Sequence, residues 1–303
     1  MKESTVLFGD RKSLVGIITE PGLVEGPTNP TAVLLLNAGL VHRVGPARLY
    51  TRMARSLAEA GFTVLRFDFS GIGDSEVRKD QLSSEESAIH EAREAMDLMN
   101  TTRKVSKFVL AGICSGAHNS LPIALADPRV AGTLLIESYG YSTTGYIVTT
   151  YVRRLFRWRM WWKLLTGQLR PWNWLQSTVS AVSSRVSQRL NEENPAWQPP
   201  PTEKIISDLR TLGQRGVRLC FIYDSLGPSY YYYRSTLRRD VEASCDPTKI
   251  QVVAIVGTDH TFTPLFQQER LIKTVCEWAQ ENFGAGNGVP RRGVDAQESV
   301  LPP

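Results

Sequence analysis

One short stretch constrains the fold of this chain more than any other, the sequence GICSG at positions 112–116. The apolar residues 108–111 precede it and predict a buried strand, and residues 117–126 follow it with a composition compatible with a helix. Small residues on both sides let a strand and a helix pass close together, so the side chain between them stands clear of the sheet. The stretch therefore predicts a nucleophile elbow that presents the thiol of Cys114.

The surroundings of this cysteine favour reactivity. The start of the following helix directs free N–H groups and the positive end of the helix dipole at the sulfur, which favours the thiolate, the reactive form of cysteine. The alternative interpretation is a small buried cysteine at the end of a strand, which is a common core position. The presence or absence of catalytic partner residues elsewhere in the chain distinguishes a reactive cysteine from a core cysteine.

Strands and helices alternate along most of the sequence. Residues 5–8 and 14–19 predict an opening hairpin. The later predicted strands are residues 32–36, 63–67, 107–111, 131–136, 218–223 and 250–256, and the predicted helices are residues 50–60, 84–99, 117–126, 202–212, 231–241 and 265–283. Together with the elbow, this alternation predicts an α/β-hydrolase fold, with a mostly parallel central sheet, helices on both faces and an inserted helical cap.

One interruption of the alternation predicts the domain organisation. We expect residues 1–138 and 201–283 to form the α/β-hydrolase core, residues 139–200 to form the cap, and residues 284–303 to be a disordered tail rich in glycine, proline and charge. In addition, we expect four aromatic side chains to bind substrate: Tyr139, Trp158, Trp162 and Tyr231.

The predicted cap is locally basic and rich in tryptophan. Between Glu137 and Glu192 the sequence has no acidic residue, five tryptophans and eight basic residues, whereas the whole chain has a net charge of only +5. Three interpretations stay open: an anionic substrate with apolar bulk, an amphipathic helix at a membrane surface, and a packed lid helix whose arginines face water. No recognition motif accompanies the charge, so we expect no nucleic-acid partner.

A histidine and a carboxylate should complete a catalytic site. His260 follows the last predicted strand, where an α/β-hydrolase places its base. Asp224 closes the preceding strand and is our preferred partner for His260, and Glu137, at the end of strand 131–136, is the alternative.

Acyl chemistry also needs donors for an oxyanion. We expect one donor to be the backbone N–H of Ser115 and the other to come from the loop of small residues that follows strand 32–36. The loop residues concerned are Ala38, Gly39 and Leu40. The alternative interpretation of this loop is a plain tight turn.

Three segments carry a resemblance to a known family: residues 35–46 (LLNAGLVHRVGP), residues 65–75 (LRFDFSGIGDS) and residues 112–117 (GICSGA). They resemble the α/β-hydrolases encoded beside exosortases, over roughly residues 30 to 140. Related cysteine-type enzymes are the dienelactone hydrolases and the polyketide-pathway relatives that eliminate acetate from an acetylated tetronate. The resemblance implies the fold and a cysteine–histidine site, and it does not fix a substrate.

The chain departs from this family at the acid. In the family the acid follows its strand by several residues, just before a proline or glycine, and the matching position here is Gly227. Either Asp224 or Glu137 serves as the acid in its place, or His260 lacks a carboxylate partner. The last case would favour proton transfer over hydrolysis.

Two catalytic hypotheses and one non-catalytic hypothesis follow. In the first, Cys114 attacks an ester, thioester or lactone of a small anionic or apolar metabolite. In the second, the chain is a lyase that eliminates acetate from an acetylated tetronate-type intermediate in antibiotic biosynthesis. In the third, it is a binding module on the same fold.

The composition sets the remaining expectations. The four cysteines show no metal spacing, so we expect a small-molecule substrate and neither a cofactor nor a metal. No run of 18 apolar residues is present, so we expect no integral membrane segment. The absence of a signal-peptide pattern predicts a cytoplasmic location, and the sequence leaves a homodimer open.

Overall fold

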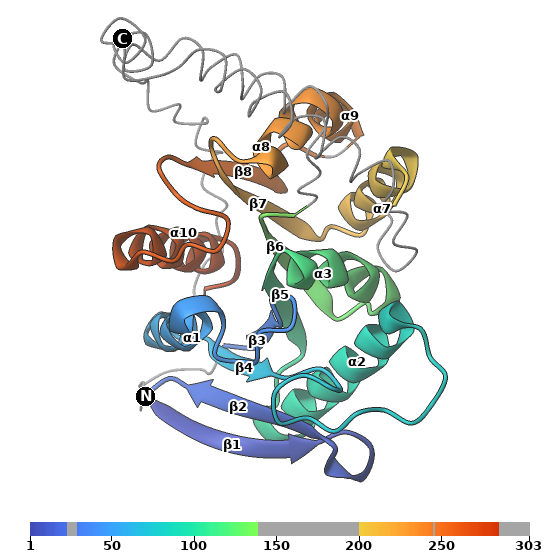
Figure 1. The fold of residues 1–303 in the computed structure, drawn as a ribbon, viewed down its shortest axis with the longest axis vertical. Coiled ribbons are helices and arrows are strands. Elements are labelled where there is room, and N and C mark those ends of the chain that lie inside the picture. The colour runs from blue at the N-terminus through green and yellow to red at the C-terminus, as the bar shows by residue number, and fades with distance from the viewer. Residues whose placement is uncertain (23–28, 139–199, 245, 285–303) are drawn as a thin grey trace, which may run out of the picture. The chain divides into compact units, whose positions relative to one another are not determined.

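The computed structural model describes residues 1–22, 29–138, 200–244 and 246–284. In these residues the strands form one eight-stranded sheet in the order β1-β2-β4-β3-β5-β6-β7-β8 (Figure 1). Their bounds are β1 Lys2–Phe8, β2 Leu14–Glu20, β3 Thr31–Leu36, β4 Thr63–Phe67, β5 Lys107–Ile113, β6 Val130–Ile136, β7 Arg218–Asp224 and β8 Ile250–Ile255. The hairpin β1–β2 runs antiparallel and β2 pairs antiparallel with β4, whereas β4, β3 and β5 to β8 pair in parallel.

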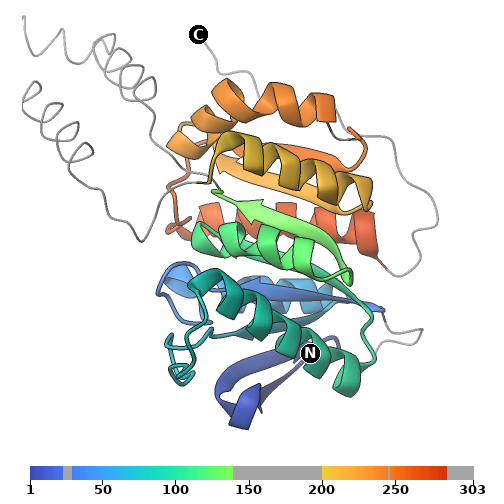
Figure 2. The ribbon, with the colours of Figure 1, turned by 90° about the vertical axis from the view of Figure 1, so that its right-hand side faces the viewer.

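Helices cover both faces of the sheet. Their bounds are α1 Leu49–Glu59, α2 Ser84–Arg103, α3 Ser115–Ala126, α7 Thr202–Gln214, α8 Pro228–Tyr232, α9 Arg238–Ser244 and α10 Leu265–Phe283. Helices α1 and α10 lie side by side on one face (Figure 1), and α2, α3, α7 and α9 lie on the other, which faces the viewer in Figure 2. This arrangement is the α/β-hydrolase fold, so the predicted mostly parallel sheet with helices on both faces is confirmed.

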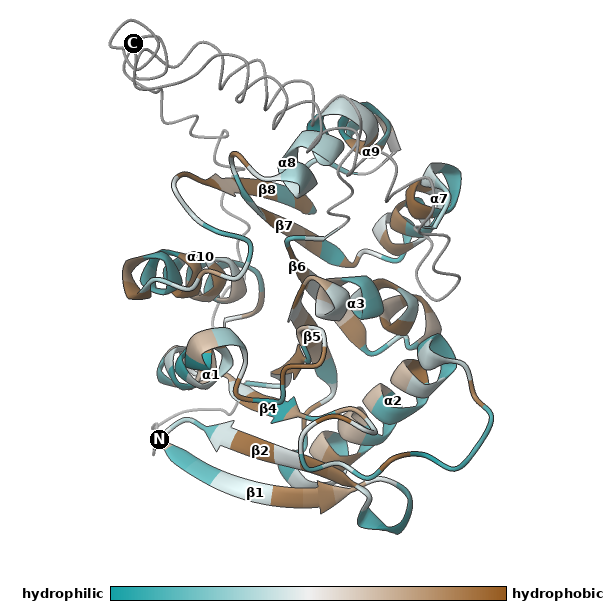
Figure 3. Ribbon diagram, in the orientation of Figure 1, coloured by the Kyte–Doolittle hydropathy of each residue, from teal (hydrophilic) through white to brown (hydrophobic). Residues whose placement is uncertain are grey.

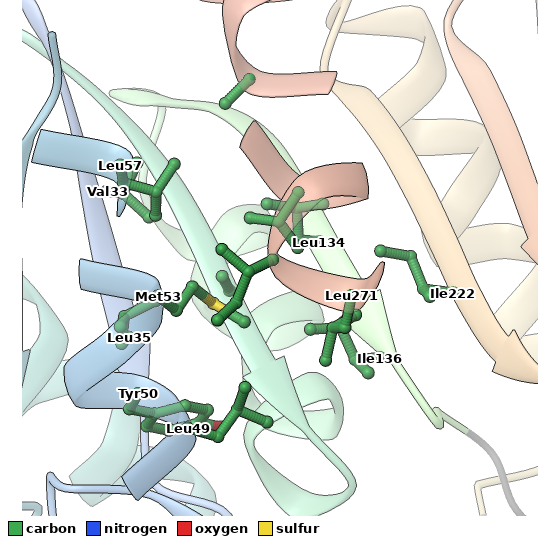
Figure 4. Close-up of a cluster of buried hydrophobic side chains, with 14 of the residues drawn as sticks. Val33, Leu35, Leu49, Tyr50, Met53, Leu57, Leu134, Ile136, Ile222 and Leu271 are labelled. Carbon is green, nitrogen blue, oxygen red and sulfur yellow. The ribbon is translucent and has the colours of Figure 1, made fainter. Parts of the chain in front are cut away.

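Burial in the hydrophobic core explains why the central strands have continuous apolar sequences. Strand β3 is buried along its whole length, because helices cover both of its faces. Apolar residues occur along most strands of the sheet, the edge strand β8 included (Figure 3). One cluster under α1 and α10 includes Leu35, Met53, Ile136, Ile222 and Leu271 (Figure 4), so it joins segments from distant parts of the sequence.

The predicted elements agree with the observed ones, with shifts at their ends. Strand β5 continues to Ile113 and α3 begins at Ser115, which leaves Cys114 alone at the turn. The predicted helix 231–241 is a longer helical segment made of α8, a π-helical turn at Tyr233–Leu237 and α9. The predicted cap and tail lie outside the described residues, apart from Pro200 and Gly284. Within the described ranges no helix combines the length and the apolar character that a membrane span requires.

Parallel pairing brings several loops together at one edge. Strands β3, β5, β6, β7 and β8 all end at the same edge because they run in the same direction. In an open α/β sheet, this carboxyl edge is where ligands bind. The candidate site residues follow these strand ends.

Candidate active site

Cys114 occupies a strained turn between β5 and α3. Its backbone has a φ of 56° and a ψ of −112°, and its N–H donates to the carbonyl of Ile136 at 2.9 Å. A non-glycine residue in such a conformation costs on the order of 1–3 kcal/mol and persists where the surrounding structure enforces it. The turn places the thiol at the carboxyl edge of the sheet, at the N-terminus of α3.

Two glycines make this turn sterically feasible. A Cβ on Gly112 would collide with the backbone of Gly116, and a Cβ on Gly116 would lie 2.6 Å from the carbonyl oxygen of Leu36 and 2.8 Å from that of Asn37. Because all of these obstacles are backbone atoms, no side-chain rotation relieves the contact. The G-x-C-x-G spacing is therefore a packing requirement of the elbow.

Replacing Gly116 with alanine is expected to destabilise the fold by about 1–3 kcal/mol, the usual cost of overpacking. The new methyl group has to push α3 away from the end of β3, which also moves Cys114. Thermal unfolding followed by circular dichroism measures the effect. An unchanged melting temperature would contradict the packing argument.

His260 and Glu137 lie close to each other at the carboxyl edge that also carries Cys114. Glu137 follows β6, has only 1% of its side chain exposed, and places Oε2 3.3 Å from Nδ1 of His260. The imidazole also hydrogen-bonds the side chain of Cys114. The three side chains thus form a chain from carboxylate to imidazole to sulfur.

Asp224, which we preferred as the partner of His260, does not take that place. Its backbone N–H donates to Oε1 of Glu137, and its own carboxylate accepts the N–H of Leu226 at 3.2 Å. Burial raises the pKa of Asp224, and the charge of the neighbouring Glu137 adds to this increase. The geometry therefore assigns the orienting position to Glu137, because the backbone of Asp224 holds the glutamate carboxylate in front of the histidine.

The charge state of His260 follows from these neighbours. Hydrogen bonding to Cys114, and next to Glu137, raises the pKa of His260 to about 10 against the opposing effect of burial. A protonated imidazole can act as an acid toward a group bound at the neighbouring Cys114. By contrast, burial lowers the pKa of His118 on α3 to about 4, so this second histidine stays neutral.

The loop that carries His260 is fixed by hydrogen bonds. The carboxylate of Asp259 accepts the N–H groups of Thr261 at 3.1 Å and Thr263 at 2.9 Å. Gln267 of α10 accepts the N–H of Asp259 and donates to the carbonyl of Gly257 at 2.7 Å. Asp259 therefore fixes the conformation of the loop that carries His260.

The expected oxyanion loop lies next to the elbow, and one of its candidate donors is already engaged. The N–H of Gly39 is not open to a ligand, because it donates to Oγ of Ser115 at 2.6 Å. Ala38 is buried and its carbonyl accepts the N–H of Val41, whereas the side chain of Leu40 is 89% exposed. The backbone N–H of Ser115 lies in the first turn of α3, where N–H groups have no acceptor within the helix.

Buried polar residues that the sequence analysis did not single out hold this loop. The amide of Asn37 donates to the carbonyl of Val41 and to the carboxylate of Asp68, and its oxygen accepts the N–H of Phe69 at 2.8 Å. Asp68 is fully buried and forms an ion pair with Arg43. The signal was present in the sequence, because these residues belong to the segments 35–46 and 65–75 that carry the family resemblance.

Tyr50 is a further residue that the sequence analysis missed. Its buried hydroxyl accepts the N–H of Ile113 at 3.0 Å, immediately before the elbow. Burial raises the pKa of Tyr50, and the electrostatic effect of the nearby Cys114 adds to this increase. The tyrosine therefore stays neutral and anchors α1 to the end of β5.

Three of the four substrate-binding candidates, Tyr139, Trp158 and Trp162, lie outside the described residues. The fourth, Tyr231, is half-buried on α8, which follows the loop after β7. In the part of the chain that the structure covers, no three His, Cys, Asp or Glu side chains are arranged to hold a metal ion.

Comparison with known proteins identifies a family. The family model described as serine aminopeptidase, S33 matches residues 28–218 of this chain. A comparison with curated proteins gives no match. Neither comparison shows the narrower resemblance to exosortase-associated or tetronate-pathway enzymes, which stays a prediction.

Solved structures of hydrolases are similar in fold. A proline iminopeptidase from Mycobacterium smegmatis is 15% identical, with a TM-score of 0.57 over 93% of this chain and 98% of that chain. An esterase from Pyrococcus furiosus is 15% identical, with a TM-score of 0.56 over 93% and 91% of the two chains. A serine hydrolase without a lid from Xanthomonas campestris is 15% identical, with a TM-score of 0.53 over 94% and 95%.

Proposed function

The chain belongs to the serine aminopeptidase S33 family of α/β-hydrolases, and from this premise we propose that it is an esterase-like enzyme that cleaves an ester or thioester through Cys114. The observation that carries the proposal is the hydrogen-bonded arrangement of Cys114, His260 and Glu137 at the carboxyl edge of the sheet. The family name refers to serine, so a thiol at the elbow sets this chain apart from the serine hydrolases to which it is similar.

The geometry supports a two-step acyl transfer. The thiolate attacks the carbonyl carbon and forms a C–S bond, and protonated His260 gives its proton to the departing oxygen or sulfur as that bond breaks. Neutral His260 then takes a proton from water, which attacks the thioester, and the C–S bond breaks to regenerate the thiolate. Glu137 holds the imidazole in one orientation and stabilises its positive charge in both steps.

Apolar side chains around the site favour a substrate with an apolar group. Leu40 follows β3, Leu226 follows β7, and Leu265 and Phe266 begin α10 just after the histidine loop; all four are exposed. Leu40 and Leu226 stand on loops at the carboxyl edge, and Leu265 and Phe266 stand on the helix that follows the histidine loop. Exposed apolar side chains gathered near a reactive group are typical of a surface that binds an apolar ligand.

The alternative lyase reaction receives less support. An elimination needs a base and the exclusion of water, and a histidine without a carboxylate partner would have favoured it. Glu137 lies beside His260 instead, which supports acyl transfer. Elimination of acetate from a tetronate-type substrate therefore rests on the resemblance of residues 35–46, 65–75 and 112–117 alone.

A covalent intermediate is the direct test. Wild-type protein incubated with p-nitrophenyl acetate is expected to gain the mass of one acetyl group and to release p-nitrophenol, first in a burst and then at the rate of deacylation. Peptide mapping should place the acetyl group on Cys114, and neutral hydroxylamine should remove it because it is a thioester. Absence of both the mass gain and the burst would contradict the proposal.

A further inference from the structure

The side chain of Ser115 engages one amide of the loop that follows β3. Ser115 is the first residue of α3, and its Oγ accepts the N–H of Gly39 at 2.6 Å. A backbone amide has one proton to donate. One of the three loop residues that sequence reasoning offers as a donor, Gly39, is therefore already engaged.

The hydroxyl that receives this bond still has a proton of its own. Its nearest acceptor is the carbonyl oxygen of Asn37 at 3.5 Å, which is too long for a strong hydrogen bond. A hydroxyl hydrogen rotates about the C–O bond without disturbing the bond that the oxygen accepts. The accepted N–H from Gly39 also polarises the hydroxyl and makes it a better donor.

The contact between Ser115 and Gly39 is built into the fold. Gly116 lets the start of α3 approach the carbonyls of Leu36 and Asn37, and Asn37 is itself tied to Val41 and Asp68. Separation of the two residues would require movement of this network. The Gly39 amide is therefore held on the hydroxyl of Ser115.

We propose that Ser115 supplies both oxyanion donors, its backbone N–H and its side-chain hydroxyl, and that Gly39 acts through the hydroxyl. Ser115 is then a catalytic residue of the acyl transfer, and Gly39 positions and polarises it. This inference rests on the proposed function, because an oxyanion forms only when Cys114 attacks a carbonyl. No proton leaves the hydroxyl; it donates a hydrogen bond that strengthens as negative charge develops on the substrate oxygen.

Two reactions of the same thiol separate this role from other effects of a mutation. Acetylation by p-nitrophenyl acetate passes through an oxyanion, whereas alkylation by iodoacetamide requires the thiolate and no oxyanion. Replacing Ser115 with alanine is expected to slow acetylation by about 10²-fold, the loss typical of one oxyanion donor. The rate of alkylation should stay the same, and Ser115→Thr, which keeps a hydroxyl, should recover most of the acetylation rate.

The outcomes are distinct. If Ser115→Ala is acetylated as fast as wild type, or faster, the hydroxyl does not donate to the oxyanion and the inference is overturned. Equal slowing of acetylation and alkylation would overturn it too, because the mutation would then act on the thiolate. If wild-type protein itself is alkylated but never acetylated, the proposed function has failed, and with it the premise of the inference.

Discussion

Alanine in place of Cys114 is expected to lower the turnover of an activated ester by about 10⁴-fold or more, because loss of the nucleophile removes the covalent route altogether. The same substitution should lower the pKa of His260 from about 10, since hydrogen bonding to Cys114 is the largest cause of its elevation. Steady-state hydrolysis of p-nitrophenyl acetate measures the first effect. Titration of the His260 ring protons by NMR measures the second.

Cys114→Ser is the matched control for this experiment. A serine hydroxyl keeps the shape of the elbow but is neutral at ordinary pH, so turnover should fall less than in the alanine variant while the pKa of His260 still decreases. A normal melting temperature in both variants would show that the fold is intact. Acetylation of the alanine variant at Ser115 would contradict our assignment, because the nucleophile would then be the neighbouring residue.

The fold and the elbow could be predicted from sequence because their signals are local. Alternating strands and helices, a strand-to-helix turn between two glycines and a histidine after the last strand are all patterns within short segments. Steric contacts at Gly112 and Gly116 explain why these positions hold glycine. Because backbone packing requires glycine at both positions, the G-x-C-x-G pattern can be found from the sequence.

The choice between the two acids and the engagement of the Gly39 amide could not be predicted, because they depend on backbone directions between segments. Glu137 and Asp224 lie at the ends of neighbouring strands, paired through Ile136 and Ile222, so the sequence offers both as candidates, and our preference for Asp224 was wrong. Glu137 has a φ of 51°, a left-handed conformation that is uncommon for glutamate and that the neighbouring sequence does not predict. In the same way, only the fold shows that the N–H of Gly39 points at a serine side chain.

Glutamine in place of Glu137 is expected to reduce turnover by about 10³- to 10⁴-fold, as when an orienting carboxylate is replaced by its amide in a catalytic triad. Glutamine has nearly the same size, so it can still accept the N–H of Asp224, but it cannot stabilise a charged imidazole. Hydrogen bonding to Glu137 is the second cause of the high pKa of His260, so this pKa should decrease in the variant. The protonated form of His260, which acts as the acid for the leaving group, would then be lost at a lower pH.

Asp224→Asn provides the comparison that decides between the two carboxylates. This change leaves the backbone N–H that holds Glu137 in place and removes only a side-chain charge that does not reach the imidazole. Turnover should therefore stay within about threefold of wild type, in line with the small effects of substitutions away from a reacting group. The pH–rate profile and the NMR titration of His260 should both resemble those of the wild type. A larger loss in Asp224→Asn than in Glu137→Gln would instead assign the orienting role to Asp224 and would require the loop after β7 to rearrange when substrate binds.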